Sequence, residues 1–318
     1  MKPRNDPMSR LPLLLCLLPL LSASGLRSQE HWFYLDNGHV RLGVNVDAGG
    51  SIGWFSHSHS TANLLNAFDH GRYVQQSYYG DQDGSEWNGK PWRYNPVQGG
   101  SWKGVPATVL EKKEGKDSLY VKTKPRQWAS GRDVDDMILE QWLTLDGGLA
   151  HLKYRMTYTG TAEHQPTHQE LPAVFVTPRC DTLVFCEKGS PAWIGAPLVR
   201  KLPGPPGAKD GIVKFSEPWA AWVDGDGQGL GMWFPHTDFA TTYRVRNAGA
   251  DGVGDCSYLA PLQTFALKPG LVLEYETVLA IGSAEQIRAI FTKLHAQREA
   301  RKEDPSPATG SQRHSHRR

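Results

Sequence analysis

The sequence predicts an all-β protein, a large antiparallel β-sandwich with one C-terminal amphipathic helix. Three observations lead to this fold class. Apolar and polar residues alternate with a period of two in about a dozen segments, which is typical of half-buried strands. Turn signals separate these segments at intervals of about 8–12 residues, as they do in sandwiches. Glycine (33) and proline (22) are abundant in the 318 residues, and only one segment has a strong helical pattern.

The predicted strands can be followed along the chain. Residues 39–46 alternate strictly between apolar and polar positions. Residues 107–124 predict a hairpin that turns near Gly115, and residues 137–158 predict a second hairpin at Asp146-Gly147-Gly148. Further strands are expected at residues 171–176, 182–185, 212–215, 219–224, 229–234, 241–247 and 271–282.

One helix is expected near the C-terminus. Ser283 and Gln286 have the spacing of a capping box, in which each side chain satisfies a backbone N–H of the other. The helix has an apolar stripe formed by Ile287, Ile290, Phe291 and Leu294. From residue 301 to residue 318 the composition is polar, basic and rich in Pro and Ser, so we expect a disordered tail there.

The N-terminus has the pattern of a signal peptide. Lys2, Arg4 and Arg10 form a basic region, residues 11–21 are apolar, and residues 22–25 are small. The apolar run is too short to span a bilayer, which takes about 20 residues. We therefore expect a signal peptide at 1–28, one domain at 29–300, and a secreted or periplasmic protein with no membrane span.

Net charge bears on the class of partner, and the cysteines bear on disulfides and metal sites. The formal net charge is +2 at pH 7 and becomes −1 without residues 1–28, which carry +3, so no nucleic-acid partner is expected. After the signal peptide the cysteines are Cys180, Cys186 and Cys256. A Cys180–Cys256 bridge, a Cys186–Cys256 bridge and three buried thiols all remain open. There is no C-x-x-C pair, and we expect no metal and no other cofactor.

Residues 68–100 combine aromatic rings with amides. Seven of the 30 residues from Tyr73 to Trp102 are Tyr or Trp. Buried amides and charges need partners, and exposed rings are costly, so a groove is favoured over core. Rings can stack on sugar C–H faces while amides bond to hydroxyls, which indicates carbohydrate; the alternative is a self-packed β-loop. The candidate binding residues are Asp69, Arg72, Gln75, Gln76, Tyr79, Trp87, Asn95 and Gln98.

A second candidate group lies at the mouth of a strand. His168, Gln169 and Glu170 follow a turn and precede an apolar run. Alternate residues of a strand share a face, so His168 and Glu170 should point the same way and could act as acid and base. The alternative is a polar turn at a strand edge. Trp219 and His236 are further candidates for the binding site.

Several segments resemble galactose-mutarotase-like domains. The segment "DNGHVRLGVNVDAGGSIGWFSHSHSTANLLNAFDHGR" is similar to their opening strands, and "YRMTYTGTAEHQPTHQELPAVFV" resembles the strand pair that brings a catalytic His to the groove. The resemblance implies a β supersandwich. It also implies that His168 protonates the ring oxygen, that Arg72 holds the sugar, and that a late Glu, Glu274 or Glu276, is the base. The chain also looks like secreted bacterial proteins of unassigned activity.

Three carbohydrate chemistries remain open at this point. An epimerase would pair His168 with Glu170 or Glu274. A uronate lyase would use Arg72, Gln76, Tyr78, Tyr79 and His168. A hydrolase would use two carboxylates from Asp69, Glu170 and Asp224. The alternatives to an enzyme are a non-catalytic carbohydrate-binding module and a structural protein of the envelope. The expected partner is a mono-, oligo- or polysaccharide.

Overall fold

The computed structural model describes residues 31–303, so the predicted signal peptide and most of the predicted tail lie outside the described residues. The first strands are β1 (Trp32–Asp36), β2 (Val40–Asn45), β3 (Ser51–His57), β4 (Gln75–Ser77), β5 (Gln82–Trp87), β6 (Lys90–Arg93), β7 (Pro96–Val97), β8 (Thr108–Glu114), β9 (Ser118–Lys124) and β10 (Arg126–Gln127). They are followed by β11 (Met137–Asp146), β12 (Leu149–Tyr158), β13 (Thr167–Val176), β14 (Thr182–Glu187), β15 (Val199–Lys201), β16 (Ile212–Val223), β17 (Gln228–Trp233), β18 (Phe239–Val245), β19 (Cys256–Phe265) and β20 (Val272–Ser283). Helix α1 (Ala284–Glu303) follows the last strand.

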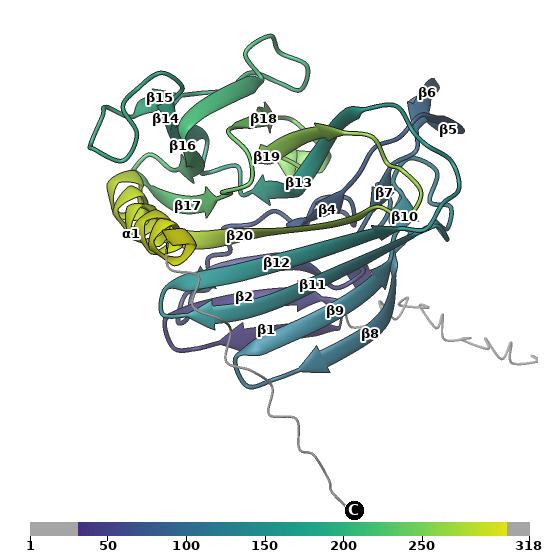
Figure 1. Ribbon diagram of the computed structural model, residues 1–318, viewed down its shortest axis with the longest axis horizontal. Coiled ribbons are helices and arrows are strands. Elements are labelled where there is room, and N and C mark those ends of the chain that lie inside the picture. The colour runs from purple at the N-terminus through teal and green to yellow at the C-terminus, as the bar shows by residue number, and fades with distance from the viewer. Residues whose placement is uncertain (1–30, 304–318) are drawn as a thin grey trace, which may run out of the picture.

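Most strands belong to one 15-stranded sheet, which curves around the core (Figure 1). Its main path runs β10-β7-β4-β13-β19-β18-β16-β17-β20-β12-β11-β9-β8, with β14 and β15 as a branch at β16. A three-stranded sheet of β1, β2 and β3 packs against it, and β5 and β6 form a separate hairpin. The predicted fold class, all-β and antiparallel with one C-terminal helix, is confirmed.

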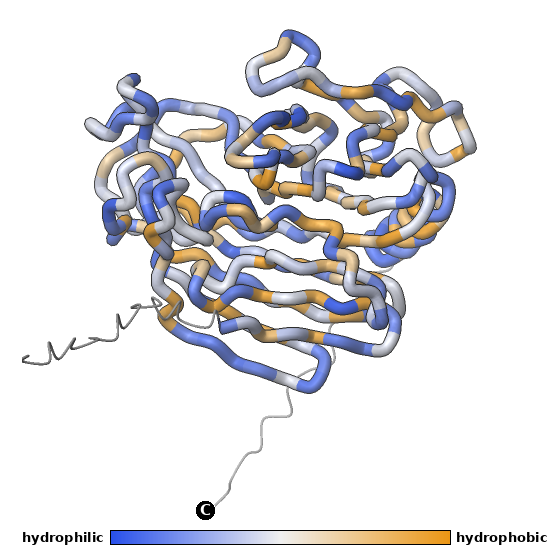
Figure 2. The backbone as a smooth tube through the Cα atoms, turned by 180° about the vertical axis from the view of Figure 1, so that it is seen from behind, coloured by the Kyte–Doolittle hydropathy of each residue, from blue (hydrophilic) through white to orange (hydrophobic). Residues whose placement is uncertain are grey.

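The two predicted hairpins form where expected. Strands β11 and β12 pair from Met137↔Tyr158 to Asp146↔Leu149, with Gly147 at a φ of 52° in the turn. Strand β11 alternates buried and partly buried residues over its length, as a strand with one face on the core must. Figure 2 shows the same alternation as orange and blue along neighbouring strands. The second hairpin joins β8 and β9 through Gly115.

The turn between β2 and β3 requires glycine. Gly49 has a φ of +58°, a conformation that residues with a Cβ rarely adopt. A Cβ on Gly49 would lie 1.8 Å from the carbonyl oxygen of Gln98. The turn is therefore packed directly on the backbone at the end of the aromatic-rich segment, and it helps to fix that segment in place.

Helix α1 covers the outer face of β16, β17 and β20. The Gln286 N–H donates to Ser283 Oγ (3.2 Å), and the Ser283 N–H donates to Gln286 Oε1 (2.8 Å), which confirms the capping box. Ile287 and Phe291 are buried, with Ile290 and Leu294 packed beside them. The helix continues to Glu303, so residues 301–303 are helical and not part of a disordered tail.

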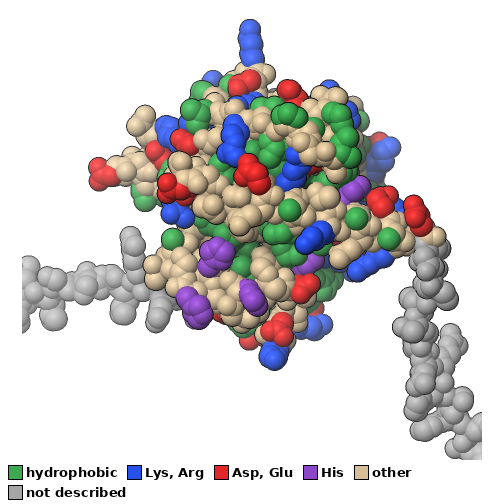
Figure 3. All heavy atoms as spheres, turned by 90° about the vertical axis from the view of Figure 1, so that its left-hand side faces the viewer, with side chains coloured by type: hydrophobic (Ala, Val, Ile, Leu, Met, Phe, Trp, Pro, Cys, Tyr) green, Lys and Arg blue, Asp and Glu red, His purple; other side chains and the backbone are tan. Residues whose placement is uncertain are grey.

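Residues 31–303 also bear on the predictions about cysteines, membrane spans and charge. Cys180, Cys186 and Cys256 are buried free thiols, so the three-thiol alternative holds. None of the described helices combines the length and the apolarity needed to cross a bilayer. On the face shown in Figure 3, basic and acidic side chains are interspersed. The absence of a nucleic-acid partner stays a prediction.

Candidate functional site

A cavity of about 670 Å³ lies beside β4 and β13. Its walls come from the segment around Arg72, the β5–β6 hairpin, and strands β13, β18 and β19. Figure 1 shows β13, β18 and β19 side by side, with the β5–β6 hairpin at the upper right. The lining residues used below are Phe68, Asp69, Arg72, Gln75, Ser77, Tyr79, Trp87, Trp92, Asn95, Trp102, Trp128, Glu170, Tyr243 and Tyr258.

Strand alternation decides which residues of the "QQSYY" segment reach the cavity. Gln75, Ser77 and Tyr79 line it. Gln76 and Tyr78 point to the opposite face and are fully buried, and the Tyr78 hydroxyl donates to Gln76 Oε1 (2.9 Å). Gln76, predicted to bind substrate, and Tyr78, predicted to transfer a proton, therefore do not reach this site.

Glu170 is the best-placed acid–base group. It is half-buried and pairs across the sheet with Ser77. Burial raises the pKa of Glu170, while hydrogen bonding by the hydroxyls of Tyr258, Tyr79 and Ser77 acts to lower it. Tyr243 stacks on Tyr258 with ring centroids 4.2 Å apart. A carboxyl whose pKa is raised by burial, among phenol hydroxyls in a cavity, is a candidate for proton transfer.

Asp69 and Arg72 form the second polar group. The Arg72 guanidinium lies 3.2 Å from Asp69 Oδ2, and the Gly71 N–H donates to Asp69 Oδ1 (2.8 Å). Burial nevertheless raises the pKa of Asp69, although the Arg72 charge opposes this. Arg72 also donates to the Gly254 carbonyl and lies over the Phe68 ring at 5.3 Å. Of the described side chains that line the cavity, Arg72 is the only basic one, and its charge is paired.

Four tryptophans form one wall, called here the tryptophan wall: Trp87, Trp92, Trp102 and Trp128. Ring centroids are 5.3 Å apart for Trp87–Trp92, 5.4 Å for both Trp87–Trp128 and Trp92–Trp128, and 6.4 Å for Trp102–Trp128. The wall packs the β5–β6 hairpin onto the domain. It leaves Trp102 36% exposed at the outer end.

The structure brings together about half of the predicted site residues. Those that line the cavity are Asp69, Arg72, Gln75, Tyr79, Trp87, Asn95 and Glu170. Those that do not are Gln76, Tyr78, Gln98, His168, Trp219 and His236. Gln75 and Asn95 brace the backbone: Gln75 Oε1 accepts from the Gly99 N–H (2.8 Å), and Asn95 Nδ2 donates to the Tyr78 carbonyl (2.8 Å).

His168 lies outside the cavity, which corrects the prediction that it shares the site with Arg72. Its ring Nδ1 lies 2.7 Å from the Thr264 hydroxyl, and the side chain is exposed. Strand β4 pairs with β13 at Glu170 and Ala173, the part of β13 that borders the cavity. His168 is on the same face of β13 as Glu170, two residues before it, and is not among the residues that line the cavity.

Three other candidates are structural. Trp219 is buried beneath α1 and donates to Glu217 Oε2 (2.7 Å). Burial lowers the pKa of His236 to about 4, so its imidazole is neutral, and Nε2 lies 2.9 Å from the Leu171 carbonyl. Gln98 is fully buried, with its Oε1 3.4 Å from the Gln76 N–H.

The proposed late bases and Asp224 also lie elsewhere. Glu274 is ion-paired with Arg155 and with Lys153 (3.0 Å). Glu276 is ion-paired with Arg298. Asp224 Oδ1 accepts from two backbone N–H groups in the β16–β17 turn.

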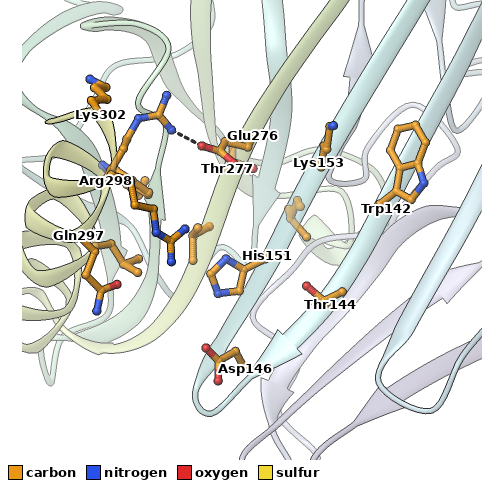
Figure 4. A pocket seen from close by; sticks show the side chains of 15 residues that line it. Trp142, Thr144, Asp146, His151, Lys153, Glu276, Thr277, Gln297, Arg298 and Lys302 are labelled. Carbon is orange, nitrogen blue, oxygen red and sulfur yellow. Dashed lines mark hydrogen bonds and ion pairs between the residues drawn. The ribbon is translucent and has the colours of Figure 1, made fainter. Parts of the chain in front are cut away.

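A second cavity, of about 660 Å³, separates α1 from the outer face of β11, β12 and β20 (Figure 4). Figure 4 shows Gln297 and Arg298 of α1 on one side of the cavity and His151 and Lys153 of β12 on the other, with Arg298 bonded to Glu276. In this second cavity the Glu276 carboxylate is neutralised by its ion pair with Arg298, and Lys153 is neutralised by Glu274. The cavity beside Glu170 combines a carboxyl of raised pKa with a wall of aromatic rings, so it is the better candidate for chemistry.

Sequence reasoning missed Tyr243, Tyr258 and Trp128. The two tyrosines come from β18 and β19, more than 160 residues after Arg72. Their approach to Glu170 depends on long-range strand pairing, which no local pattern shows. Trp92 and Trp102 were within the aromatic-rich stretch, so its density was a usable signal for them.

Comparison with known proteins defines the fold. No family model matches the chain, and no curated protein matches it in sequence. A candidate aldose 1-epimerase of Escherichia coli K12 superposes with a TM-score of 0.52 at 15% identity, over 80% of this chain and 100% of that chain. The chain has the galactose-mutarotase-like fold.

Two further structures agree. A galactose mutarotase related enzyme of Lactobacillus acidophilus gives a TM-score of 0.50 at 12% identity, over 80% and 98% of the two chains. The Slr1438 protein of Synechocystis sp. PCC 6803 gives 0.51 at 14% identity, over 80% and 96%. At these identities the likeness shows a shared galactose-mutarotase-like fold. The chemistry depends on the residues of the site.

Proposed function

We propose that this protein is a carbohydrate-active enzyme of the aldose-epimerase type, which binds a neutral sugar in the cavity beside Glu170. The single observation that carries the proposal is the Glu170 carboxyl. Its pKa is raised by burial, tyrosine hydroxyls surround it, and the tryptophan wall offers a surface on which a sugar can stack. The fold, shared with epimerase-named proteins, supports the same reaction class.

The charge of the cavity favours a neutral sugar over a uronate. A uronate lyase needs a cation or amide to neutralise the substrate carboxylate. Arg72 is already paired with Asp69, and Gln76, Tyr78 and His168 lie outside the cavity. A substrate carboxylate would instead face Asp69 and Glu170, and like charges in a buried site repel.

In the proposed reaction Glu170 takes the proton from the anomeric hydroxyl. The C1–O5 bond then breaks, C1 becomes an aldehyde, and O5 receives a proton. Glu170 delivers the proton that it has taken to O5, because O1 and O5 are both bonded to C1 and lie within reach of one carboxyl. Rotation about C1–C2 and the reverse steps close the other anomer and return the proton from O5 to the anomeric oxygen.

Hydrolysis is the second candidate, because two carboxyls in one cavity are also what a glycosidase uses. A panel of neutral sugars and glycans separates the two reactions. Anomer exchange followed by NMR reports epimerisation, and new reducing ends report hydrolysis. If neither product forms with any sugar while several sugars bind, the protein is a binding module instead.

Substitution at Glu170 tests the assignment of the proton-transfer group. Glu170→Gln should lower turnover by about 10²–10⁴-fold, the usual contribution of a positioned acid or base. Glu274→Gln is the matched control, since Glu274 lies on the outer face of the sheet and should leave turnover unaltered. Full activity in Glu170→Gln would disprove the assignment.

We also propose that the protein is exported. The support is the basic, apolar and small-residue order of residues 1–28. Expression of the full chain, followed by N-terminal sequencing of the extracellular or periplasmic product, tests this. Recovery of only the uncleaved chain from the cytoplasm would refute it.

A further inference from the structure

The tryptophan wall extends away from Glu170 toward solvent. At the inner end, Ser77 pairs with Glu170 across the sheet, and Asn95 Nδ2 donates to Ser77 Oγ (3.3 Å). Asn95 Oδ1 in turn accepts from Trp92 Nε1 (3.3 Å), which connects the carboxyl to the wall. The rings then continue outward through Trp128, so that one lined surface joins the reacting group to the rim.

Exposure increases along this surface. Ser77 is 3% exposed and Asn95 is 2% exposed, whereas Trp102 at the far end is 36% exposed. The Lys103 ammonium lies 5.8 Å from the Trp102 ring centroid, and Trp102 Nε1 donates to the Ala129 carbonyl (3.1 Å), so the ring is held in place. A fixed, partly exposed indole at the mouth of a cavity is a ready stacking surface.

The size of the cavity is the third observation. A volume of about 670 Å³ lies in the middle of the range for drug-sized ligands, which is more than a single pyranose ring needs. The sites for polar contact are gathered at the Glu170 end, while the other wall offers mainly ring faces. Ring faces suit further sugar units that need only be stacked and not chemically changed.

From these observations we infer that the tryptophan wall is a second subsite, and that the substrate is the end of a neutral oligosaccharide. The terminal unit lies at Glu170, and the next units stack outward along the wall to Trp102. This inference rests on the proposed function for the identity of the reacting end. The binding of longer chains on the wall can be measured without any turnover.

Calorimetric titration with neutral oligosaccharides of one to four units tests the inference. The probes are α- and β-linked gluco-, galacto- and manno-oligosaccharides. In at least one series, affinity should rise by about tenfold between one and three units, and Trp102→Ala should remove most of that rise. Trp102→Phe, which keeps a flat ring, should restore part of it. Trp142→Ala, on the outer face of the sheet, is the matched control and should retain the full rise.

The outcomes separate this inference from the proposed function. Affinity that does not change with chain length, equal loss at all lengths in Trp102→Ala, or no binding in any series would each overturn the second subsite. Glu170→Gln should bind the series with the same dependence on length while lacking turnover. If Glu170→Gln stays active, the proposed function fails, and the titration still decides the subsite.

Discussion

Glu170 should make the folded protein less stable at neutral pH than a neutral side chain of the same shape would. Burial raises the pKa of Glu170 above its ordinary value of 4.5. Between 4.5 and that raised pKa the folded state binds more protons than the unfolded state, so stability falls as pH rises through this window. Glu170→Gln removes the ionisation and should therefore remove this part of the pH dependence.

The expected change in the free energy of unfolding follows from a general observation: a group placed for catalysis often makes the folded state less stable. We expect Glu170→Gln to be more stable than the parent protein at pH 7 by about 0.5–2 kcal/mol. For a domain of this size, 1 kcal/mol corresponds to a rise in Tm of roughly 2–4 °C. The same substitution should raise the activation barrier by about 3–5 kcal/mol, which is the cost of losing 10²–10⁴-fold in turnover.

Urea denaturation at several pH values between 4 and 8 measures the effect. The stability difference between Glu170→Gln and the parent protein should be greatest at pH 7 and should approach zero near pH 4, where Glu170 is protonated in both states. Glu274→Gln should show the opposite sign, because Arg155 and Lys153 lower the pKa of the Glu274 carboxyl. A Glu170→Gln variant that is less stable at pH 7, with an unchanged pH slope, would refute this account of the site.

Three further predictions follow from single contacts. Glu217→Ala should cost about 3–5 kcal/mol in urea denaturation, because it leaves the Arg288 charge without its buried partner; a loss below about 1 kcal/mol would contradict this. Gly49→Ala should cost about 3 kcal/mol or more or prevent folding, because its Cβ would meet the Gln98 carbonyl; a normal melting temperature would disagree. His168→Ala should keep turnover within about twofold, since His168 lies outside the cavity, and a hundredfold loss would restore it as a catalytic residue.

The sequence was sufficient for the fold because the governing patterns are local. The β11–β12 hairpin has period-two alternation over its whole length and a glycine turn, and both features depend on neighbouring residues alone. The capping box at Ser283 and Gln286 likewise involves one helical turn. Each of these elements formed where the pattern placed it.

The site could be predicted only in part. Alternation showed that Gln75 and Gln76 cannot both face one cavity, but it could not say which of them does. It placed His168 and Glu170 on one face, but only Glu170 lines the cavity, because the other walls come from distant segments that no pattern within β13 shows. Tyr243 and Tyr258 reach Glu170 through the pairing of β18 with β19, which is set by the whole sheet.

Glu170 and the tryptophan wall lie on elements that differ in how firmly they are held. Glu170 lies within the central path of the large sheet, between β4 and β19, so its position is fixed by pairing on both sides. Trp87 and Trp92 lie on the β5–β6 hairpin, which pairs only with itself and stands apart from the main sheet (Figure 1). Sites built on rigid elements hold chemistry, while loops and hairpins tolerate substitution. Under the proposed function, changes in the hairpin should therefore alter which sugars bind, whereas changes on β13 at Glu170 should remove the reaction itself.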